Sequence, residues 1–257
     1  MKPSFISSGE SRNVVIYLHG VGSGKEGWEA QTSATNDSGW RFIAVDAPGF
    51  GETPLPENSG FAPHVESLLE LIDSLEAERI VLCGHSLGGM TAQEFYAIHP
   101  DKISGLILSA TSPAFGKPDG DFQKEFLRAR FEPFEKGMTM PEFANQFAKK
   151  LLGPSPKSEA VQQVIEVMSS VSVDAYKLSM NTIVSFDQRA NLPNIKVPTL
   201  LIAGERDANS PAKMMSRMAQ HIPSSQYIEL KDTGHMAPIE NAAVFNQHLS
   251  KFLRNLF

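Results

Sequence analysis

The residues best placed to do chemistry in this sequence surround Ser86. Ser86 is the serine of a Gly-x-Ser-x-Gly pattern, flanked by Gly84 and Gly88. The apolar run 80–83 before it indicates a buried strand, and residues 90–99 after it indicate a helix. A sharp strand-to-helix turn of this kind, a nucleophile elbow, holds its serine strained above the carboxyl end of a sheet. We expect Gly84 and Gly88 to be needed because a side chain at either would collide with the other arm of the turn.

A serine hydroxyl becomes a good nucleophile only when a base accepts its proton and a third group orients the base. Asp207 and His235 each follow a predicted strand, so both should lie with Ser86 at the carboxyl edge of a parallel sheet. The order serine, acid, histidine is the one expected for a strand–turn–helix nucleophile. We therefore predict that His235 is the general base and acid, and that Asp207 orients it. Glu205, which lies nearer the strand end, is the competing acid.

A predicted oxyanion site accompanies Ser86. Attack on a carbonyl places negative charge on its oxygen, and two convergent N–H donors stabilise that charge. The N–H of Leu87, directly after the serine, is the first candidate. The second is the N–H of Val21, in the glycine-rich loop 19–24 that follows another predicted strand. His19 is expected to brace this loop rather than to react.

The elements that must position these groups form an alternating pattern. Near-continuous apolar runs predict strands at 14–18, 41–45, 80–83, 103–108, 199–203 and 226–230, with a short first strand around 5–7. Amphipathic helices are predicted between several of these runs, including 65–75, and at the C-terminal end. This order indicates an α/β fold with a mostly parallel central sheet and helices on both faces.

Residues 112–190 differ in character from the rest of the chain. They contain no β-branched apolar run of a core strand, and their phenylalanines recur at helical spacing. Phe143 and Phe147 share one such stripe, preceded by a capping-box pattern from Thr139 to Glu142. We therefore predict a core domain from residues 1–111 and 191–257, with 112–190 forming an inserted helical cap.

Composition excludes several classes of function. Of the 257 residues, 41% are hydrophobic and 20% charged, and the net charge is −6. Because no basic block is present, neither nucleic acid nor an anionic membrane is an expected partner; the expected partner is a small-molecule substrate. One cysteine, Cys83, allows no internal disulfide and fits a reducing compartment. The sequence shows neither a secretory leader nor a membrane-spanning run, so we predict a cytoplasmic protein.

Five motifs together resemble the α/β-hydrolase-fold family over nearly the whole chain. They are His19-Gly20 with Trp28, residues 46–51 (DAPGFG), residues 84–89 (GHSLGG), residues 204–207 (GERD) and Gly234-His235. The resemblance implies a helical cap inserted after the sixth strand. The closest similarity is to the 3-oxoadipate enol-lactonase and small esterase type, on cues at 186–189, 197–200, Glu240 and 245–246. It implies a serine hydrolase that cleaves an ester or lactone of a small, partly apolar substrate through an acyl-enzyme at Ser86, with no cofactor.

Alternative functions stay open on the same residues. Haloalkane dehalogenases of this fold carry aspartate where Ser86 stands, and many carbon–carbon bond hydrolases carry tryptophan where Met236 stands. Carbon–carbon cleavage therefore ranks below ester or lactone hydrolysis. A perhydrolase or acyltransferase could use the same three residues. A small-ligand receptor with a vestigial triad is the alternative from another class.

Substrate contacts are harder to predict than the reacting groups. We expect Trp28, Phe115, Arg128 and Met236 to contact substrate. Arg128, Arg130 and Arg189 could each bind a substrate carboxylate, although a surface or structural ion pair is the simpler interpretation for each. His64 and the other helical histidines are expected to be solvated or capping. No His, Asp or Glu grouping has the spacing of a metal site, so no metal is predicted.

Overall fold

A seven-stranded sheet forms the centre of the molecule in a computed structural model that describes residues 2–116 and 120–256. The strand order is β1-β3-β2-β4-β5-β6-β7, and every neighbouring pair is parallel except β1 with β3. The strands are β1 (Phe5–Ser8), β2 (Asn13–Leu18), β3 (Arg41–Val45), β4 (Arg79–His85), β5 (Gly105–Ser109), β6 (Thr199–Gly204) and β7 (Ser225–Leu230). The predicted α/β class with a mostly parallel sheet is confirmed.

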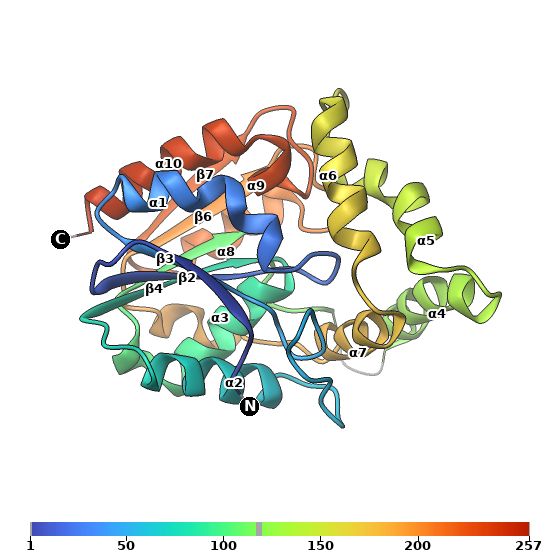
Figure 1. The fold of residues 1–257 in the computed structure, drawn as a ribbon, viewed down its shortest axis with the longest axis horizontal. Helices are drawn as coiled ribbons and strands as arrows, with labels where there is room; N and C mark the ends of the chain where they lie inside the picture. Colours follow the sequence, from blue (N-terminus) through green and yellow to red (C-terminus); the bar gives the residue numbers. More distant parts are fainter. Residues whose placement is uncertain (1, 117–119, 257) are drawn as a thin grey trace.

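Helices cover both faces of this sheet and extend beyond one end of it (Figure 1). They are α1 (Thr32–Asn36), α2 (Ala62–Asp73), α3 (Leu87–Ile98), α4 (Asp121–Glu135), α5 (Met140–Phe147), α6 (Ser158–Ser169), α7 (Val173–Ile183), α8 (Ala212–Gln220), α9 (Ala237–Glu240) and α10 (Ala242–Arg254). Short 3₁₀ segments lie at Lys25–Gln31, Pro100–Lys102, Ala148–Leu151 and Arg189–Asn194. Residues 2–116 and 120–256 contain no helix that is both long and apolar enough to cross a membrane.

The two faces of the sheet use alternate residues of each strand, as the two-residue period of a strand requires. In β2, Ile16 and Leu18 pack in a core under α2, α3 and α8. Val15 and Tyr17 face the opposite core, which α10 covers with Phe245 and its neighbours. Burial on both faces explains why these strands read as continuous apolar runs.

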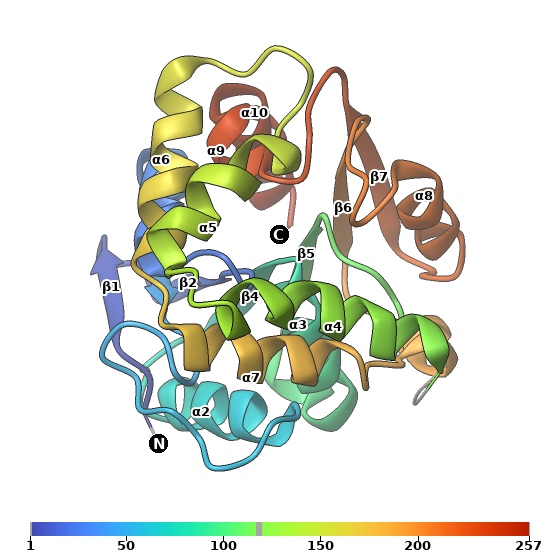
Figure 2. The ribbon, with the colours of Figure 1, turned by 90° about the vertical axis from the view of Figure 1, so that its right-hand side faces the viewer.

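Helices α4 to α7 form a separate apolar cluster over one end of the sheet, and α4 and α7 lie side by side there (Figure 2). They occupy the segment between β5 and β6. The family resemblance implied an insertion after the sixth strand; in the described structure it follows the fifth, because β1 is the one strand before β2. The division into core residues 1–111 and 191–257 and cap residues 112–190 stays a prediction.

Helix α3 and strand β5 begin at other residues than the sequence predicted. Helix α3 begins at Leu87 rather than residue 90, because the helix starts immediately after the turn at Ser86. Strand β5 spans Gly105–Ser109 rather than 103–108, since Ile103 belongs to the connection that leads into it. The early start of α3 brings the first free N–H groups of that helix next to the serine.

Candidate active site

Ser86 lies at the tip of a strained turn between β4 and α3. Its backbone dihedral angles are φ 53° and ψ −116°, a conformation that a residue with a side chain rarely adopts. The surrounding structure holds it there. The Ser86 N–H donates to the carbonyl of Ser109 over 2.9 Å, and the Thr111 hydroxyl donates to the Ser86 carbonyl over 2.8 Å. This is the geometry of a nucleophile elbow.

The two glycines of the elbow are required for different reasons. A Cβ at Gly84 would lie 2.3 Å from the carbonyl oxygen of Gly88, so the expected collision with the other arm of the turn holds there. A Cβ at Gly88 would instead lie 2.0 Å from the carbonyl oxygen of Leu18. The expectation for Gly88 was therefore wrong in its partner: this glycine lets α3 approach the end of β2.

His235 and Asp207, predicted to be partners, are in hydrogen-bonding contact. His235 Nδ1 donates to Asp207 Oδ2 over 2.8 Å. The other carboxylate oxygen, Oδ1, accepts from the N–H groups of Asn209 and Ser210 over 2.8 and 3.0 Å. Burial raises the pKa of Asp207, but the His235 charge and these hydrogen bonds outweigh it, so the net pKa lies below its ordinary value. Asp207 is thus an anion that accepts the hydrogen bond from His235 Nδ1–H, which leaves Nε2 on the far side of the ring unprotonated and free to act as a base.

Glu205, the competing acid, contacts a different group. Its Oε2 accepts from the N–H of Asp232 over 2.9 Å and lies 3.4 Å from Arg206 Nε. Glu205 therefore joins the loops that follow β6 and β7. The acid that contacts His235 is Asp207.

His85 and His235 lie beside each other at the serine, with ring centroids 4.9 Å apart. Within the described part of the chain no hydrogen bond joins the Ser86 hydroxyl to His235, and such bonds often form only once substrate binds. Burial, and then the His235 charge, holds the pKa of His85 well below its usual range. A neutral His85 adds no positive charge beside His235.

The loop predicted to supply the second oxyanion donor lies against the elbow. A Cβ at Gly20 would come within 3.1 Å of the Ser86 Cβ, so the loop backbone passes directly beside the serine. Among the described residues, the N–H groups of Val21 and Leu87 have no acceptor. Their role in holding an oxyanion stays a prediction, but both donors are free for it.

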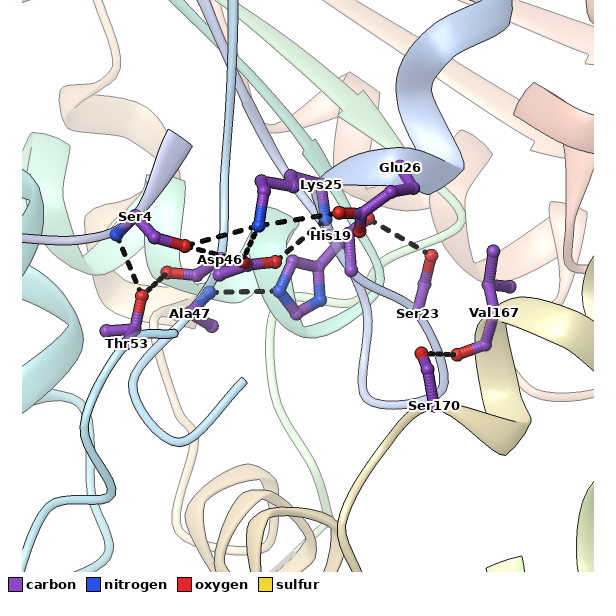
Figure 3. Close-up of polar contacts among 11 residues, drawn as sticks. Ser4, His19, Ser23, Lys25, Glu26, Asp46, Ala47, Thr53, Val167 and Ser170 are labelled. Carbon is purple, nitrogen blue, oxygen red and sulfur yellow. Dashed lines mark hydrogen bonds and ion pairs between the residues drawn. The ribbon is translucent and has the colours of Figure 1, made fainter. Parts of the chain in front are cut away.

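A buried polar network holds this loop to the sheet (Figure 3). His19 Nε2 accepts from the Ala47 N–H over 2.9 Å, so its Nδ1 carries the proton and donates to the Gly20 carbonyl over 2.8 Å. Burial lowers the pKa of His19, in keeping with the neutral ring that these two bonds require. Asp46 then accepts from the Lys25 backbone N–H over 3.0 Å and pairs with Lys25 Nζ at 2.5 Å. His19 therefore braces the loop, as expected.

Comparison with known protein families shows which family this chain belongs to. The family model for the alpha/beta hydrolase fold matches residues 13–242. The chain belongs to the α/β-hydrolase-fold family. This match runs from β2 into α10 and includes the elbow, Asp207 and His235.

Individual relatives cover nearly the whole length of this α/β-hydrolase. It is 27% identical to the AB hydrolase superfamily protein YisY of Bacillus subtilis (strain 168), over 93% of this chain and 90% of that protein. It is 24% identical to 3-oxoadipate enol-lactonase 1 of Acinetobacter baylyi, over 98% and 92%. Among solved structures, a thermophilic esterase from Thermogutta terrifontis superposes with a TM-score of 0.88 at 28% identity, over 98% of this chain and 93% of that one. The resemblance to esterases and enol-lactonases inferred from the motifs is confirmed.

A cavity of about 340 Å³ lies between the elbow and the cluster of helices α4 to α7 of this α/β-hydrolase. Ser86, His235 and the Val21 loop form its floor. Its other walls are mainly apolar and aromatic, and two of the four predicted substrate contacts, Phe115 and Met236, are among them. The volume is that of a small-molecule site.

The other two predicted substrate contacts, Trp28 and Arg128, are not in the cavity wall. Trp28 is 2% exposed and packs against Tyr17 and Phe245 in the core. The Arg128 side chain is 70% exposed and pairs with Glu125 one helical turn earlier. These two predictions were wrong, because Trp28 fills the core beneath its loop and Arg128 lies on the solvent side of α4.

Two residues have more buried positions than the sequence suggested. Arg130, two residues beyond Arg128, lines the cavity in its place. His64, expected to be solvated or capping, is 4% exposed. Tyr176, which no sequence pattern singled out, also lines the cavity. Only the apolar spacing of residues 173–183 could have indicated a buried helix there; no sequence pattern showed which side chains face the serine.

Glu240, noted from the sequence only as a family cue, joins the histidine loop to the chain segment at Gly153. Its two carboxylate oxygens accept from the N–H of Gly153 at 2.5 Å and from the N–H of Gly234 at 2.7 Å. Gly234 immediately precedes His235, so the carboxylate fixes the backbone that carries the predicted base. The pKa of Glu240 is raised, mainly by burial and also by the Asp207 charge, against the lowering effect of these two bonds.

Proposed function

We propose that this α/β-hydrolase is a serine hydrolase that cleaves a carboxylic ester or lactone of a small, partly apolar substrate. The main observation in support is that Ser86, in a strained backbone conformation, and His235, oriented by Asp207, line the same cavity. A serine, a base and an anion that orients the base are the parts of a nucleophilic triad. Similarity to an esterase and to an enol-lactonase supports ester or lactone chemistry over other uses of the triad.

The proposed reaction has two stages. Ser86 Oγ attacks the substrate carbonyl while His235 Nε2 accepts its proton, and the N–H groups of Val21 and Leu87 hold the oxyanion. His235 then gives this proton to the leaving alkoxide, which leaves an ester between Ser86 and the acyl group. A water molecule, deprotonated by His235, attacks that ester; the acid is released, and His235 returns the proton to the leaving Ser86 Oγ. Asp207 stabilises the imidazolium in both stages.

The test uses the Ser86→Ala variant with activated 4-nitrophenyl esters and small lactones. We expect kcat to fall by about 10⁶-fold, as in other enzymes that lose a triad serine. A circular dichroism spectrum and melting temperature close to those of the wild type would show that the fold persists. Full turnover by this variant would refute the proposal.

Trapping the intermediate separates hydrolysis from other uses of the triad. A slowly released acyl group should add its mass to the peptide that contains Ser86, and to no peptide of Ser86→Ala. Product analysis with added alcohol or hydrogen peroxide then distinguishes transfer of the acyl group from its hydrolysis. Binding of esters without turnover would favour a receptor with a vestigial triad.

A further inference from the structure

Arg130 is a cation in the aromatic part of the cavity wall. It extends from α4, and its guanidinium carbon lies 4.4 Å from the ring centroid of Phe147 and 5.1 Å from that of Phe126. All three side chains line the cavity that contains Ser86. Two aromatic faces hold the guanidinium plane in place and attract its charge, but they do not neutralise it.

No carboxylate within residues 2–116 and 120–256 pairs with Arg130. The contrast on the same helix is Arg128, whose guanidinium makes two hydrogen bonds to Glu125 at 2.7 and 3.0 Å. A partly desolvated cation without a counter-ion is costly to hold. An anionic ligand would recover that cost, whereas a neutral ligand would desolvate Arg130 further.

Tyr176 supplies a second unsatisfied polar group in the same cavity. Tyr176 lines the cavity and is only 2% exposed; its hydroxyl oxygen is itself buried, and among residues 2–116 and 120–256 it has no hydrogen-bond partner. Burial raises its pKa to about 12, against the opposing influence of the nearby Arg130 charge, so the hydroxyl keeps its proton at neutral pH. A buried hydroxyl is rarely left without a partner, and this one can donate to a ligand oxygen.

We propose that Arg130 and Tyr176 bind a carboxylate on the substrate, so that the preferred substrates are anionic esters or lactones. The guanidinium offers a planar pair of N–H donors that fits a carboxylate, and the tyrosine hydroxyl adds a third donor. The mainly apolar residues that line the rest of the cavity fit a hydrocarbon segment that joins the carboxylate to the reacting carbonyl. The ester or lactone part of this inference rests on the proposed function; the carboxylate site does not.

The test compares two substrates that differ in one charge. The 4-nitrophenyl monoester of glutaric acid carries a free carboxylate, and its methyl-capped counterpart carries a neutral methyl ester at the same position. We expect the wild type to prefer the anionic substrate in kcat/KM. Arg130→Gln should lower kcat/KM for the anionic substrate by about 10- to 100-fold, the range for losing a hydrogen bond to a charged group. It should change the value for the neutral substrate by less than about 3-fold.

Three further variants separate binding from general damage. Arg128→Gln, on the same helix but outside the cavity, should leave both substrates unaffected. Tyr176→Phe keeps the ring and removes only the hydroxyl, so it should lower the anionic value by about 3- to 10-fold with the neutral value retained. Arg130→Lys keeps the charge but loses the planar fork and should fall between the wild type and Arg130→Gln.

A binding measurement keeps the inference independent of turnover. In the Ser86→Ala background, glutarate monomethyl ester should bind measurably by calorimetry, dimethyl glutarate should bind at least about 10-fold more weakly, and Arg130→Gln should abolish the difference. Equal losses for both substrates in Arg130→Gln, or no preference for the anion in the wild type, would overturn the carboxylate site. If neither ester is turned over, the proposed function fails, and calorimetry alone decides the site.

Discussion

The backbone N–H of His235 donates to the carbonyl oxygen of Leu151 over 2.6 Å. Leu151 ends the 3₁₀ segment Ala148–Leu151, which continues from α5, whereas His235 follows the last strand of the sheet. A Cβ at Gly234 would lie 2.5 Å from the carbonyl carbon of Leu152, so the two backbones are in direct contact. The position of the predicted base therefore depends on the same helical segment that lines the cavity.

Glu240 fixes the same junction, because its carboxylate accepts from the N–H groups of Gly153 and Gly234; it is therefore a positioning residue for His235. In Glu240→Ala, the N–H groups of Gly153 and Gly234 lose their acceptor, which should lower the free energy of unfolding by about 2–4 kcal/mol. It should also reduce kcat more than it raises KM, because the histidine backbone is no longer fixed relative to Ser86. Urea titration and steady-state kinetics measure the two effects. Glu240→Gln, which keeps one acceptor oxygen, should recover part of both, and equal activity in all three proteins would contradict this role.

Replacing Asp207 by asparagine tests the orienting acid. The amide would present an N–H donor or a neutral oxygen to His235 Nδ1, so the tautomer with a free Nε2 acceptor loses its stabilisation. We expect kcat to fall by about 10⁴-fold with the fold retained, as in other serine triads. Glu205→Gln is the matched control, since Glu205 contacts Asp232 and Arg206 instead. A larger loss in the control than in Asp207→Asn would show that the acid is misassigned.

Lys25 should stabilise both the fold and the loop of Val21. The Lys25 side chain is 13% exposed and Asp46 only 1%, so Lys25→Met leaves a buried carboxylate without its cation. The expected loss is about 3–5 kcal/mol of unfolding free energy, with reduced kcat because the loop beside Ser86 loosens. Lys102→Met is the control: its pair with Asp73 is exposed, and its loss should cost at most about 1 kcal/mol. Similar melting temperatures for the two variants would argue against a buried pair.

His64 should make the protein less stable in acid. Burial, with a smaller contribution from His19, lowers its pKa from 6.5 to about 4. As pH falls from 6.5 to 4, the unfolded chain gains a proton at His64 that the folded protein does not, so unfolding becomes more favourable, by at most about 3 kcal/mol. Unfolding free energies of His64→Gln should therefore fall less steeply over this range than those of the wild type. His221→Gln, at an exposed position, should keep the wild-type slope, and parallel curves for all three proteins would exclude the effect.

The pairing of Asp207 with His235 could be predicted because strand ends are local features. Each strand is an apolar run, parallel strands end at one edge, and the residue after each end is fixed by the sequence. Glycines at 84 and 88 marked the turn for the same reason. The strained backbone at Ser86 could be predicted from the Gly-x-Ser-x-Gly pattern. The close approach of Gly88 to Leu18 could not, because these two residues are far apart in the chain.

The cavity wall could not be read in the same way. Arg128 and Arg130 are two residues apart on α4, so their side chains point about 200° apart around the helix axis and only one can face the serine. The sequence offered both arginines but contained no information on how α4 is rotated against the sheet.

The sequence by itself determined the α/β fold, the elbow at Ser86 and the identity of its two expected partners, because strand, turn and helix signals are local and their order is fixed. Tertiary structure decided which groups share the space above the serine. It buried Trp28 in the core, placed Arg130 and Tyr176 in the cavity wall, and buried His64. These outcomes depend on packing between segments far apart in the chain, and the free energy of that packing is a property of all the contacts together.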